Sequence, residues 1–295
     1  MNIIEYIKGQ FRNGGAHISL IYINIAVFVM IKAVLLMCKL FLLDGLDVTE
    51  FAAMPSNISL LGAKFWTPIT YMFFHENFWH ILFNMLCLYW FGILFLQYFS
   101  GKQLISVYVF GGLLAAAFYL LSFNVLPYYQ HHFPFGLLMG ASGAIMAIIV
   151  AVAMWQPNAE IRLLFIGAVK LKFVAIAFIL LSFFGLTSSN GGGEMAHLGG
   201  AAAGWLFAYR LKNKNKDITA WINRIIDWFA TIFKPHTSKL KYTKPDFSRM
   251  SDAEFNMNKA QNSAEIDRIL DKIKASGYES LTKDEKQFLF SQGKK

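Results

Sequence analysis

Charged residues are scarce in this sequence. They make up 15% of its 295 residues, whereas soluble domains carry about 25%. Long central stretches hold almost none of them, and most of the charge falls after residue 211. Because 56% of the chain is apolar, this distribution excludes an ordinary soluble domain. It indicates an integral membrane protein with a polar C-terminal tail.

Cysteine is also rare. Cys38 and Cys87 both lie inside apolar runs, which excludes a disulfide framework and gives no metal-ligand spacing. The N-terminus lacks an early apolar stretch followed by a small-residue cleavage site, so we expect no cleaved signal peptide. The net charge of +9 comes from basic residues at the ends of apolar runs and in the tail. That placement is typical of membrane orientation and of contact with anionic headgroups, and it argues against nucleic acid as a partner.

What the chain has in abundance is apolar runs. A spanning helix needs about 20 mostly apolar residues, and the candidate runs are 19–43, 79–99, 104–123, about 141–155, 173–186 and 196–211. The last three are short, which predicts local thinning of the bilayer or a helix end held inside the protein. The sequence therefore predicts an all-α membrane protein built as a bundle of six transmembrane helices.

The positions of Lys and Arg orient this bundle. If both termini are cytoplasmic, nearly all the basic clusters beside the spans fall on the cytoplasmic side. These clusters are Lys8 and Arg12; Lys102; Arg162, Lys170 and Lys172; and Arg210, Lys212, Lys214 and Lys216. Lys64, in the first external loop, is the main exception. Lys32 and Lys39 lie inside the first run, so each must reach the interface or face protein.

The external loop over 44–78 carries an aromatic stretch at 65–74. Two interpretations stay open for this stretch. It is either an ordinary aromatic belt at the membrane interface or an element that faces a substrate.

Few polar side chains interrupt the runs, and inside a membrane such residues are candidates for function. His80 and Asn84 are four apart, on one face of the second run. Ser142 begins the fourth run and His197 begins the sixth. Each has a simpler interpretation when taken alone, because a membrane serine usually bonds its own helix and a histidine or asparagine usually links helices. All four fall toward the external side, and this combination predicts one shared site.

Small residues explain how the fourth and sixth runs could meet. Gly140, Ala141, Gly143 and Ala144 surround Ser142. On the sixth run, Gly193, His197 and Ala201 are spaced four apart, beside a second row of Ala196, Gly200 and Gly204. Two such faces allow helices to approach almost backbone to backbone.

That approach would bring a serine and a histidine within hydrogen-bond distance, about 2.6–3.2 Å. His197 would then be a general base and Ser142 a nucleophile. A helix that begins at Ser142 leaves N–H groups unpaired, and these can stabilise an oxyanion together with donors from His80 and Asn84. Glu194 lies three residues before His197 but in a Gly-rich turn, so the sequence favours a Ser–His dyad over a triad.

Three motifs carry a resemblance to a known family. They are HENFWHILFNM at 75–85, GASGAIMA at 140–147 and AHLGGAAAG at 196–204. In order and placement they resemble the H-x4-H-x3-N, G-x-S-G and A-H-x-x-G elements of the rhomboid intramembrane serine proteases. The resemblance covers roughly residues 15–211.

The resemblance implies that Ser142 is the nucleophile and His197 the base. It implies an oxyanion hole made by His80, Asn84 and the Ser142 backbone N–H, with supporting roles for Gly140, Gly143, His75, Met146 and Gly200. It further implies cleavage of single-span membrane proteins near small residues at the external membrane boundary, a cavity open to water, and neither a metal nor an organic cofactor. The expected partners are transmembrane substrates and the lipid bilayer.

The chain departs from the family's pattern at two positions. Many members have Trp-Arg in the first external loop, where this chain has Trp66 and Thr67. An aromatic residue often follows the nucleophile by four positions, where this chain has Met146, whose thioether can still pack against an imidazole. Neither departure removes a reacting group.

Two other functions are weighed against the protease. One is a catalytically inactive relative that binds client transmembrane helices, and the presence of all four candidate residues argues against it. The other is a channel or transporter. The chain has no clear inverted repeat and no chain of acidic residues inside the spans, which argues against that class.

The chain divides into four predicted parts: a cytoplasmic segment at 1–17, a six-span catalytic domain at 18–211, an amphipathic helix with a basic linker at 212–250, and a helical hairpin at 251–295. In the third part, residues 218–233 place Trp221, Ile225, Trp228, Phe229 and Ile232 broadly on one face. This pattern predicts a helix at the cytoplasmic membrane surface, with packing on another protein surface as the alternative.

The last part predicts two short helices. Ile266, Ile269, Leu270 and Ile273 share the face of the first helix, which Gly277 ends. Thr282 and Glu285 form a capping box that begins the second helix. This tail resembles one that is common on rhomboids of Bacteroidetes-type bacteria, which implies a bacterial inner membrane. We expect the tail to serve docking or regulation, with a cytoplasmic partner that the sequence does not identify.

Overall fold

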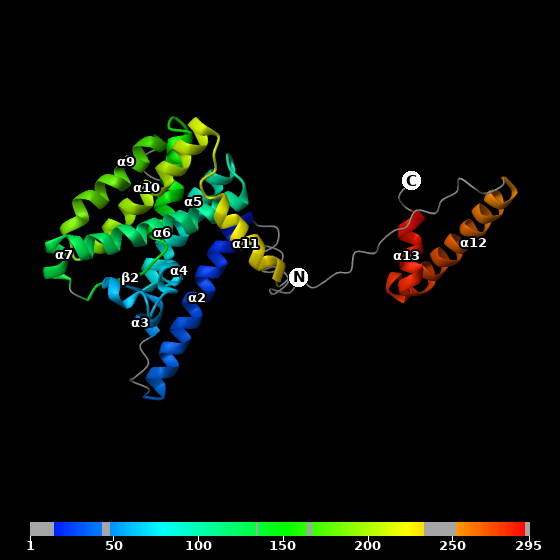
Figure 1. Cartoon of the computed structure of the whole chain (residues 1–295), viewed down its shortest axis with the longest axis horizontal. Coiled ribbons are helices and arrows are strands. Elements are labelled where there is room, and N and C mark those ends of the chain that lie inside the picture. The colour runs from blue at the N-terminus through cyan, green and yellow to red at the C-terminus, as the bar shows by residue number, and fades with distance from the viewer. Residues whose placement is uncertain (1–14, 43–47, 134, 164–166, 233–251, 293–295) are drawn as a thin grey trace. The chain divides into compact units, whose positions relative to one another are not determined.

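The computed structural model describes residues 15–42, 48–133, 135–163, 167–232 and 252–292. Within these ranges the chain is mostly helical, and it divides into two units, Met1–Ile232 and Phe233–Lys295 (Figure 1). Most of the predicted N-terminal segment and the basic linker over 234–250 lie outside the described residues.

Each of the predicted apolar runs contains a helix. These helices are α2 (Gly15–Leu40), α5 (Phe78–Leu96), α6 (Gly101–Val125), α8 (Ser142–Trp155), α9 (Leu171–Phe184) and α10 (Gly191–Lys214). Among the described residues, α2, α5 and α6 are long and apolar enough to cross a membrane, while α8 and α9 are apolar but shorter. At 1.5 Å per residue, the 14 residues of α8 span about 21 Å.

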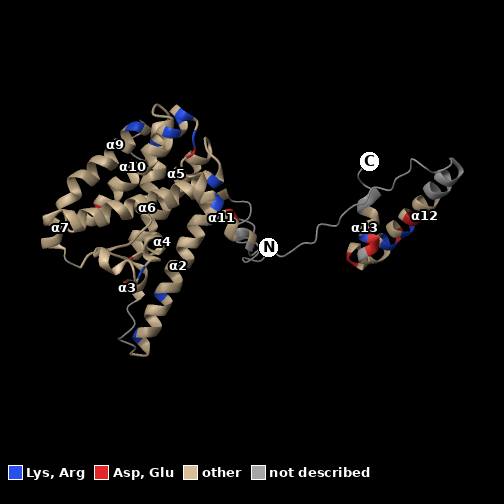
Figure 2. Cartoon of the chain, viewed as in Figure 1, with Lys and Arg blue, Asp and Glu red and all other residues tan. Residues whose placement is uncertain are grey.

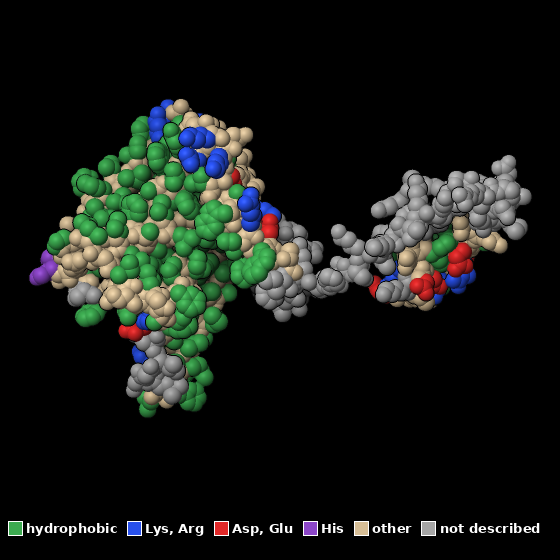
Figure 3. All heavy atoms as spheres, viewed as in Figure 1, with side chains coloured by type: hydrophobic (Ala, Val, Ile, Leu, Met, Phe, Trp, Pro, Cys, Tyr) green, Lys and Arg blue, Asp and Glu red, His purple; other side chains and the backbone are tan. Residues whose placement is uncertain are grey.

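The outward faces of the helices are apolar. The exposed side chains include Val29, Met30, Leu36, Phe83, Trp90, Leu181 and Phe184, and Figure 3 shows hydrophobic side chains over much of the visible surface of this unit. Lys, Arg, Asp and Glu residues are few on its body (Figure 2). One of them, Lys32, donates from Nζ to the backbone oxygen of Glu76 at 2.6 Å. That contact agrees with the expectation that this lysine faces protein or the interface.

Helix α8 lies at the centre of the bundle. Every residue from Gly143 to Ala153 is buried, which suits a helix that is apolar on all sides. It packs against α5, α6, α9 and α10. This central position places Ser142, the first residue of α8, where several helices meet.

The predicted close approach of the fourth and sixth runs is confirmed. A Cβ on Gly200 would overlap the carbonyl oxygen of Gly143, and a Cβ on Gly204 would overlap that of Ala147. A Cβ on Gly111 of α6 would overlap the side chain of Ala147, and a Cβ on Gly199 of α10 would lie 2.7 Å from the Leu114 carbonyl oxygen of α6. Helices α6, α8 and α10 therefore pack with parts of their backbones in direct contact.

The loop that was predicted to be external is more structured than the sequence suggests. It contains α3 (Val48–Ala52), β1 (Met54–Pro55), the 3-10 turn η1 (Ile58–Leu60), α4 (Thr67–Thr70) and the 3-10 turn η2 (Tyr71–Phe73). Strand β1 pairs antiparallel with β2 (Leu137–Leu138), just before α8, with Met54 opposite Leu138. The short helix α7 (Pro127–His132) precedes β2. Through this pairing the loop is tied to the segment that leads into Ser142.

Side-chain hydrogen bonds also hold the loop around Trp66 and Thr67. The Trp66 indole donates to the Phe51 carbonyl at 2.9 Å, and the buried Thr67 hydroxyl donates to the Lys64 carbonyl at 2.8 Å. Lys64 in turn donates to the backbone oxygen of Glu50 at 3.0 Å. The loop is thus anchored by indole, hydroxyl and ammonium donors without an arginine at position 67.

The segment between α8 and α9 forms a hairpin that the sequence analysis did not predict. Strands β3 (Glu160–Leu163) and β4 (Gly167–Lys170) pair antiparallel, with Glu160 opposite Lys170. Helix α9 follows at once and ends in the 3-10 turn η3 (Gly185–Thr187).

Helix α11 (Ala220–Ile232) confirms the predicted helix after α10. It packs against α6. The Thr219 and Ser106 hydroxyls, both fully buried, lie 2.8 Å apart, and Lys102 pairs with Asp227 at 2.8 Å. On the outer side, the predicted apolar face leaves Trp221, Ile225, Trp228 and Phe229 exposed.

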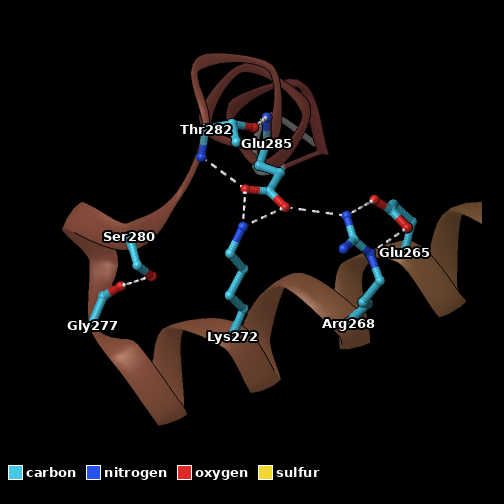
Figure 4. Close-up of polar contacts among 7 residues, drawn as sticks. All are labelled: Glu265, Arg268, Lys272, Gly277, Ser280, Thr282 and Glu285. Atoms are coloured by element: carbon cyan, nitrogen blue, oxygen red, sulfur yellow. Dashed lines mark hydrogen bonds and ion pairs between the residues drawn. The ribbon is translucent and has the colours of Figure 1, made fainter.

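The second unit is a helical hairpin of α12 (Asp252–Ser276), the 3-10 turn η4 (Tyr278–Ser280) and α13 (Lys283–Gln292). Gly277, at φ +77°, ends α12 as predicted. The predicted capping box is confirmed, because the Thr282 N–H donates to Glu285 Oε2 at 2.7 Å and the Glu285 N–H donates to Thr282 Oγ1 at 3.3 Å (Figure 4).

The predicted apolar face of α12 is only partly covered. Ile269 and Leu281 are buried, but Leu270 is 49% exposed. The short α13 covers only part of the apolar stripe on α12, so the residue at its margin stays outside. Lys272 and Arg268 of α12 reach Glu285 at 2.8 and 3.2 Å, which adds polar contacts to the small apolar core (Figure 4).

Candidate active site

A polar cavity of about 460 Å³ opens where α5, α8 and α10 meet. Its lining residues are Glu76, His80, Asn84, Leu137, Leu138, Met139, Ser142, Asn190, Gly193 and His197. The four polar residues that the sequence analysis expected to converge all line this one cavity. They come from three different helices.

Ser142 is presented by a tight turn at the start of α8. Gly140 adopts φ +113°, a conformation that side chains other than glycine rarely take. The Gly140 N–H donates to the Tyr71 carbonyl at 2.9 Å, which fixes the turn to η2. In the first turn of a helix the N–H groups have no intrahelical partner, so Ser142 and Gly143 carry backbone donors beside the Ser142 hydroxyl.

His80 lies directly over this turn. A Cβ placed on Gly140 would be 2.6 Å from His80 Nε2, so the turn needs glycine for space as well as for conformation. The Asn77 side chain caps α5 by accepting from the His80 N–H at 2.9 Å. Asn84, one turn further along α5, donates from Nδ2 to the His80 carbonyl at 2.8 Å. An amide nitrogen carries two hydrogens, so Asn84 Nδ2 can donate a second hydrogen bond.

His75 is buried beneath His80, with their ring centres 5.2 Å apart in an edge contact. It precedes α5 in the chain. Burial, reinforced by the neighbouring His80, lowers the pKa of His75 to about 4. His75 is therefore neutral at physiological pH and acts as a packing partner of His80.

His197 lies in the second turn of α10, opposite Ser142 across the cavity. Its Nδ1 atom is 3.1 Å from Glu194 Oε2 and 3.1 Å from the Ser182 hydroxyl of α9. Among the described residues, no hydrogen bond joins Ser142 Oγ to His197 directly.

The contact with Glu194 differs from the expectation drawn from the sequence. The Gly-rich stretch before His197 was predicted to be a turn, but α10 begins at Gly191. Glu194 therefore lies in the first turn of the same helix, and its i, i+3 spacing brings it onto the face of His197.

A second, apolar cavity of about 160 Å³ adjoins the first. It shares Asn84, Ser142 and His197 with the polar cavity, and its other lining residues are Phe83, Cys87, Ile145, Met146, Ile149 and Phe178. The buried Met146 lines this second cavity with His197. The serine thus lies between a polar chamber and an apolar one.

The sequence analysis missed one residue beside His197 and misplaced another. Ser182 lies inside the apolar run at 173–186. A polar residue inside an apolar run marked the other site residues as candidates, and the same criterion would have found Ser182. Glu194 was considered but placed in a turn. Among the residues that the structure describes, no group of three or more His, Cys, Asp or Glu side chains is arranged to hold a metal ion.

Comparison with known proteins agrees with this geometry. A family model described as the rhomboid domain matches residues 62–214, which is just over half of the chain. The chain therefore belongs to the rhomboid family, and it is an integral membrane protein with the fold of an intramembrane protease.

Two further similarities were found. The RHOMBOID-like protein 12, mitochondrial, of Arabidopsis thaliana is 32% identical over 145 residues, which are 46% of this chain and 43% of that protein. The chain thus matches less than half the length of this relative. Residues 251–293 match a family of unknown function, DUF6576, which coincides with the helical hairpin.

Proposed function

We propose that this protein is an intramembrane serine endopeptidase in which Ser142 is the nucleophile and His197 the general base. The observation that carries the proposal is the convergence of Ser142, His197, His80 and Asn84 on one cavity at the start of a buried helix. A structural serine or histidine would need only a neighbouring helix to bond. Four polar groups around open space suit chemistry instead.

The reaction follows from these positions. His197 takes the proton of the Ser142 hydroxyl, and Oγ bonds to the carbonyl carbon of the scissile peptide. The tetrahedral intermediate collapses, the C–N bond breaks, and His197 returns the proton to the leaving amine. A water molecule from the polar cavity then gives its proton to His197 and attacks the acyl-enzyme. The new acid leaves, and Ser142 regains its proton.

The oxyanion would be held by donors on two helices. The backbone N–H of Ser142 lies in the first turn of α8, where intrahelical partners are absent. His80 and Asn84 line the same cavity from α5. Each such donor contributes about 10²–10³ in rate when it is aimed at the developing charge.

The substrates we propose are single-span membrane proteins, cut near the external boundary of the bilayer. All six helices would cross the membrane, with both termini and the helical hairpin in the cytoplasm. The apolar face of α11 would lie in the cytoplasmic interface, because it carries two tryptophans beside the basic end of α10. The distribution of basic residues supports this orientation, and the resemblance of the tail supports a bacterial inner membrane.

The alternative is a catalytically inactive relative that binds client helices. The absence of a direct hydrogen bond between Ser142 and His197 among the described residues favours it, while the open cavity around both favours the protease. A cleavage assay separates the two functions.

The test is cleavage of a single-span reporter protein in liposomes by the wild type, Ser142→Ala and His197→Ala. We expect cleavage by the wild type and at least about a 10³-fold loss in both variants. A fluorophosphonate probe should label the wild type and leave Ser142→Ala unlabelled. A wild type that neither cleaves nor labels would make the inactive relative the better assignment.

A further inference from the structure

One ring nitrogen of His197 is held by side chains to which the proposed reaction assigns no role. Nδ1 lies 3.1 Å from Glu194 Oε2 and 3.1 Å from the Ser182 hydroxyl. An ionised carboxylate can only accept hydrogen bonds. With Glu194 beside it, Nδ1 is therefore the nitrogen that carries hydrogen, and Nε2 keeps the lone pair needed to take a proton from Ser142.

We propose that Glu194 is a positioning residue that holds His197 in this tautomer and orientation, so that the reacting unit is a Ser–His–Glu triad. The inference rests on the proposed protease function and deepens it. Ser182 is the second support of the same nitrogen, with its hydroxyl 3.1 Å from Nδ1. It ties the pair to α9, so that the base is fixed from two helices.

The surroundings leave room for the Glu194 side chain. A Cβ on Gly185, at the end of α9, would lie 2.9 Å from Glu194 Cγ. Any larger residue at position 185 would therefore push the carboxylate away from His197. The side chains of His197 and Glu194 are only 20% and 19% exposed, so water screens their interaction less than it would at an open surface.

No other titratable group offers Nδ1 the same contact among the described residues. The groups that face the pair from neighbouring elements are His80 of α5, Glu76 just before α5, and Tyr129 of α7. His80 and Glu76 lie on the side of the polar cavity. Tyr129 Oη donates to backbone oxygens of Leu186 and Gly191. Glu194 is thus the carboxylate in position to orient the base.

The experiment compares kcat and KM of the full chain in liposomes for the wild type, Glu194→Gln, Glu194→Asp and Glu160→Gln. Glu160 is an exposed carboxylate on β3, so Glu160→Gln is the matched control for loss of one charge. Glu194→Gln keeps the shape but can present an N–H to Nδ1 and favour the wrong tautomer. We expect kcat to fall by up to about 10⁴-fold, as when the orienting acid of a triad is replaced by its amide, with KM unchanged. Part of the loss should return in Glu194→Asp, and Glu160→Gln should match the wild type.

Two further measurements make the result independent of folding and of the reporter. The rate of fluorophosphonate labelling at Ser142, taken per folded molecule, should fall with kcat in Glu194→Gln. Gly185→Ala retains the carboxylate but displaces it, and should lower kcat in the same direction. If Glu194→Gln does not fold, Gly185→Ala and Glu194→Asp decide the question by the same readouts.

The outcomes are distinct. A wild type that cleaves, together with a Glu194→Gln variant as active as Glu160→Gln, overturns the triad and leaves the protease intact. A change in KM alone, with kcat unchanged in Glu194→Gln, also overturns the triad. A wild type that neither cleaves nor labels overturns the proposed function, and the inference falls with it.

Discussion

Replacement of Gly200 by alanine adds one methyl group at the contact between α8 and α10. The new Cβ would overlap the carbonyl oxygen of Gly143 and lie 2.8 Å from its carbonyl carbon and 3.2 Å from its Cα. All three are backbone atoms at the start of α8, one residue after Ser142. They cannot rotate away as a flexible side chain would, so the helices themselves must separate.

The size of the effect follows from that displacement. Carbon atoms pack at about 3.5–4.0 Å, so α10 must move by roughly 1 Å relative to α8. Overpacking of this kind costs about 1–3 kcal/mol of stability. A shift of about 1 Å between reacting groups costs about 100-fold in rate. We therefore expect Gly200→Ala to lose about two orders of magnitude in kcat and to unfold at a lower temperature.

The assay is reporter cleavage in liposomes, combined with thermal unfolding in detergent. Gly62→Ala is the matched control, because a Cβ on Gly62 meets nothing within 4 Å. Gly204→Ala meets the Ala147 carbonyl oxygen one helical turn further from the site, and should lose stability with a smaller loss of activity. Wild-type activity and stability in Gly200→Ala would refute the view that direct backbone contact sets the distance between Ser142 and His197.

Two more outcomes can be measured. Gly140→Ala strains a backbone at φ +113° and places a Cβ 2.6 Å from His80 Nε2. We therefore expect kcat to fall about 10²-fold in the reporter assay. An unchanged kcat would contradict the placement of His80. In the tail, Lys272, with the Thr282 cap, lowers the pKa of Glu285 to about 2. Since about 4.3 is usual for an unfolded chain, its contribution to hairpin stability is complete above about pH 4.3 and is lost as the pH falls toward 2. Circular dichroism of a 251–295 segment should follow this window, and Lys272→Met should shift the loss of helix to higher pH.

The helices of the first unit were largely predictable from the sequence, because apolar runs in a membrane protein have few alternatives to a helix. The elements between them were not. Strand β1 pairs with β2 across more than eighty residues of chain, Met54 with Leu138. No local pattern signals such a partner. The β3–β4 hairpin was not predicted for a different reason. Its basic residues were interpreted only as evidence for the orientation of the bundle in the membrane.

The error at Glu194 has a specific physical cause. Three successive glycines at 191–193 have low helix propensity and suggested a turn. In the structure each one is a point of close packing: a Cβ would overlap the Leu186 carbonyl oxygen at Gly191, lie 2.9 Å from Phe123 at Gly192, and lie 2.6 Å from Asn190 at Gly193. These close contacts leave no room for a larger side chain, and the helix that the glycines form places Glu194 beside His197.

The shortness of α8 connects the fold to the proposed chemistry. If the end of α8 at Trp155 lies at the cytoplasmic face, a helix of about 21 Å falls short of a hydrocarbon core of about 30 Å. Ser142 would then lie roughly 10 Å below the opposite boundary, at a depth where lipid supplies no water. Hydrolysis at that depth requires a polar chamber that reaches outward, and the cavity lined by Glu76, Asn190 and Ser142 has this composition. The apolar chamber that Ser142 also lines would receive the substrate from the lipid, so that water and peptide would reach the same serine through two chambers of different polarity.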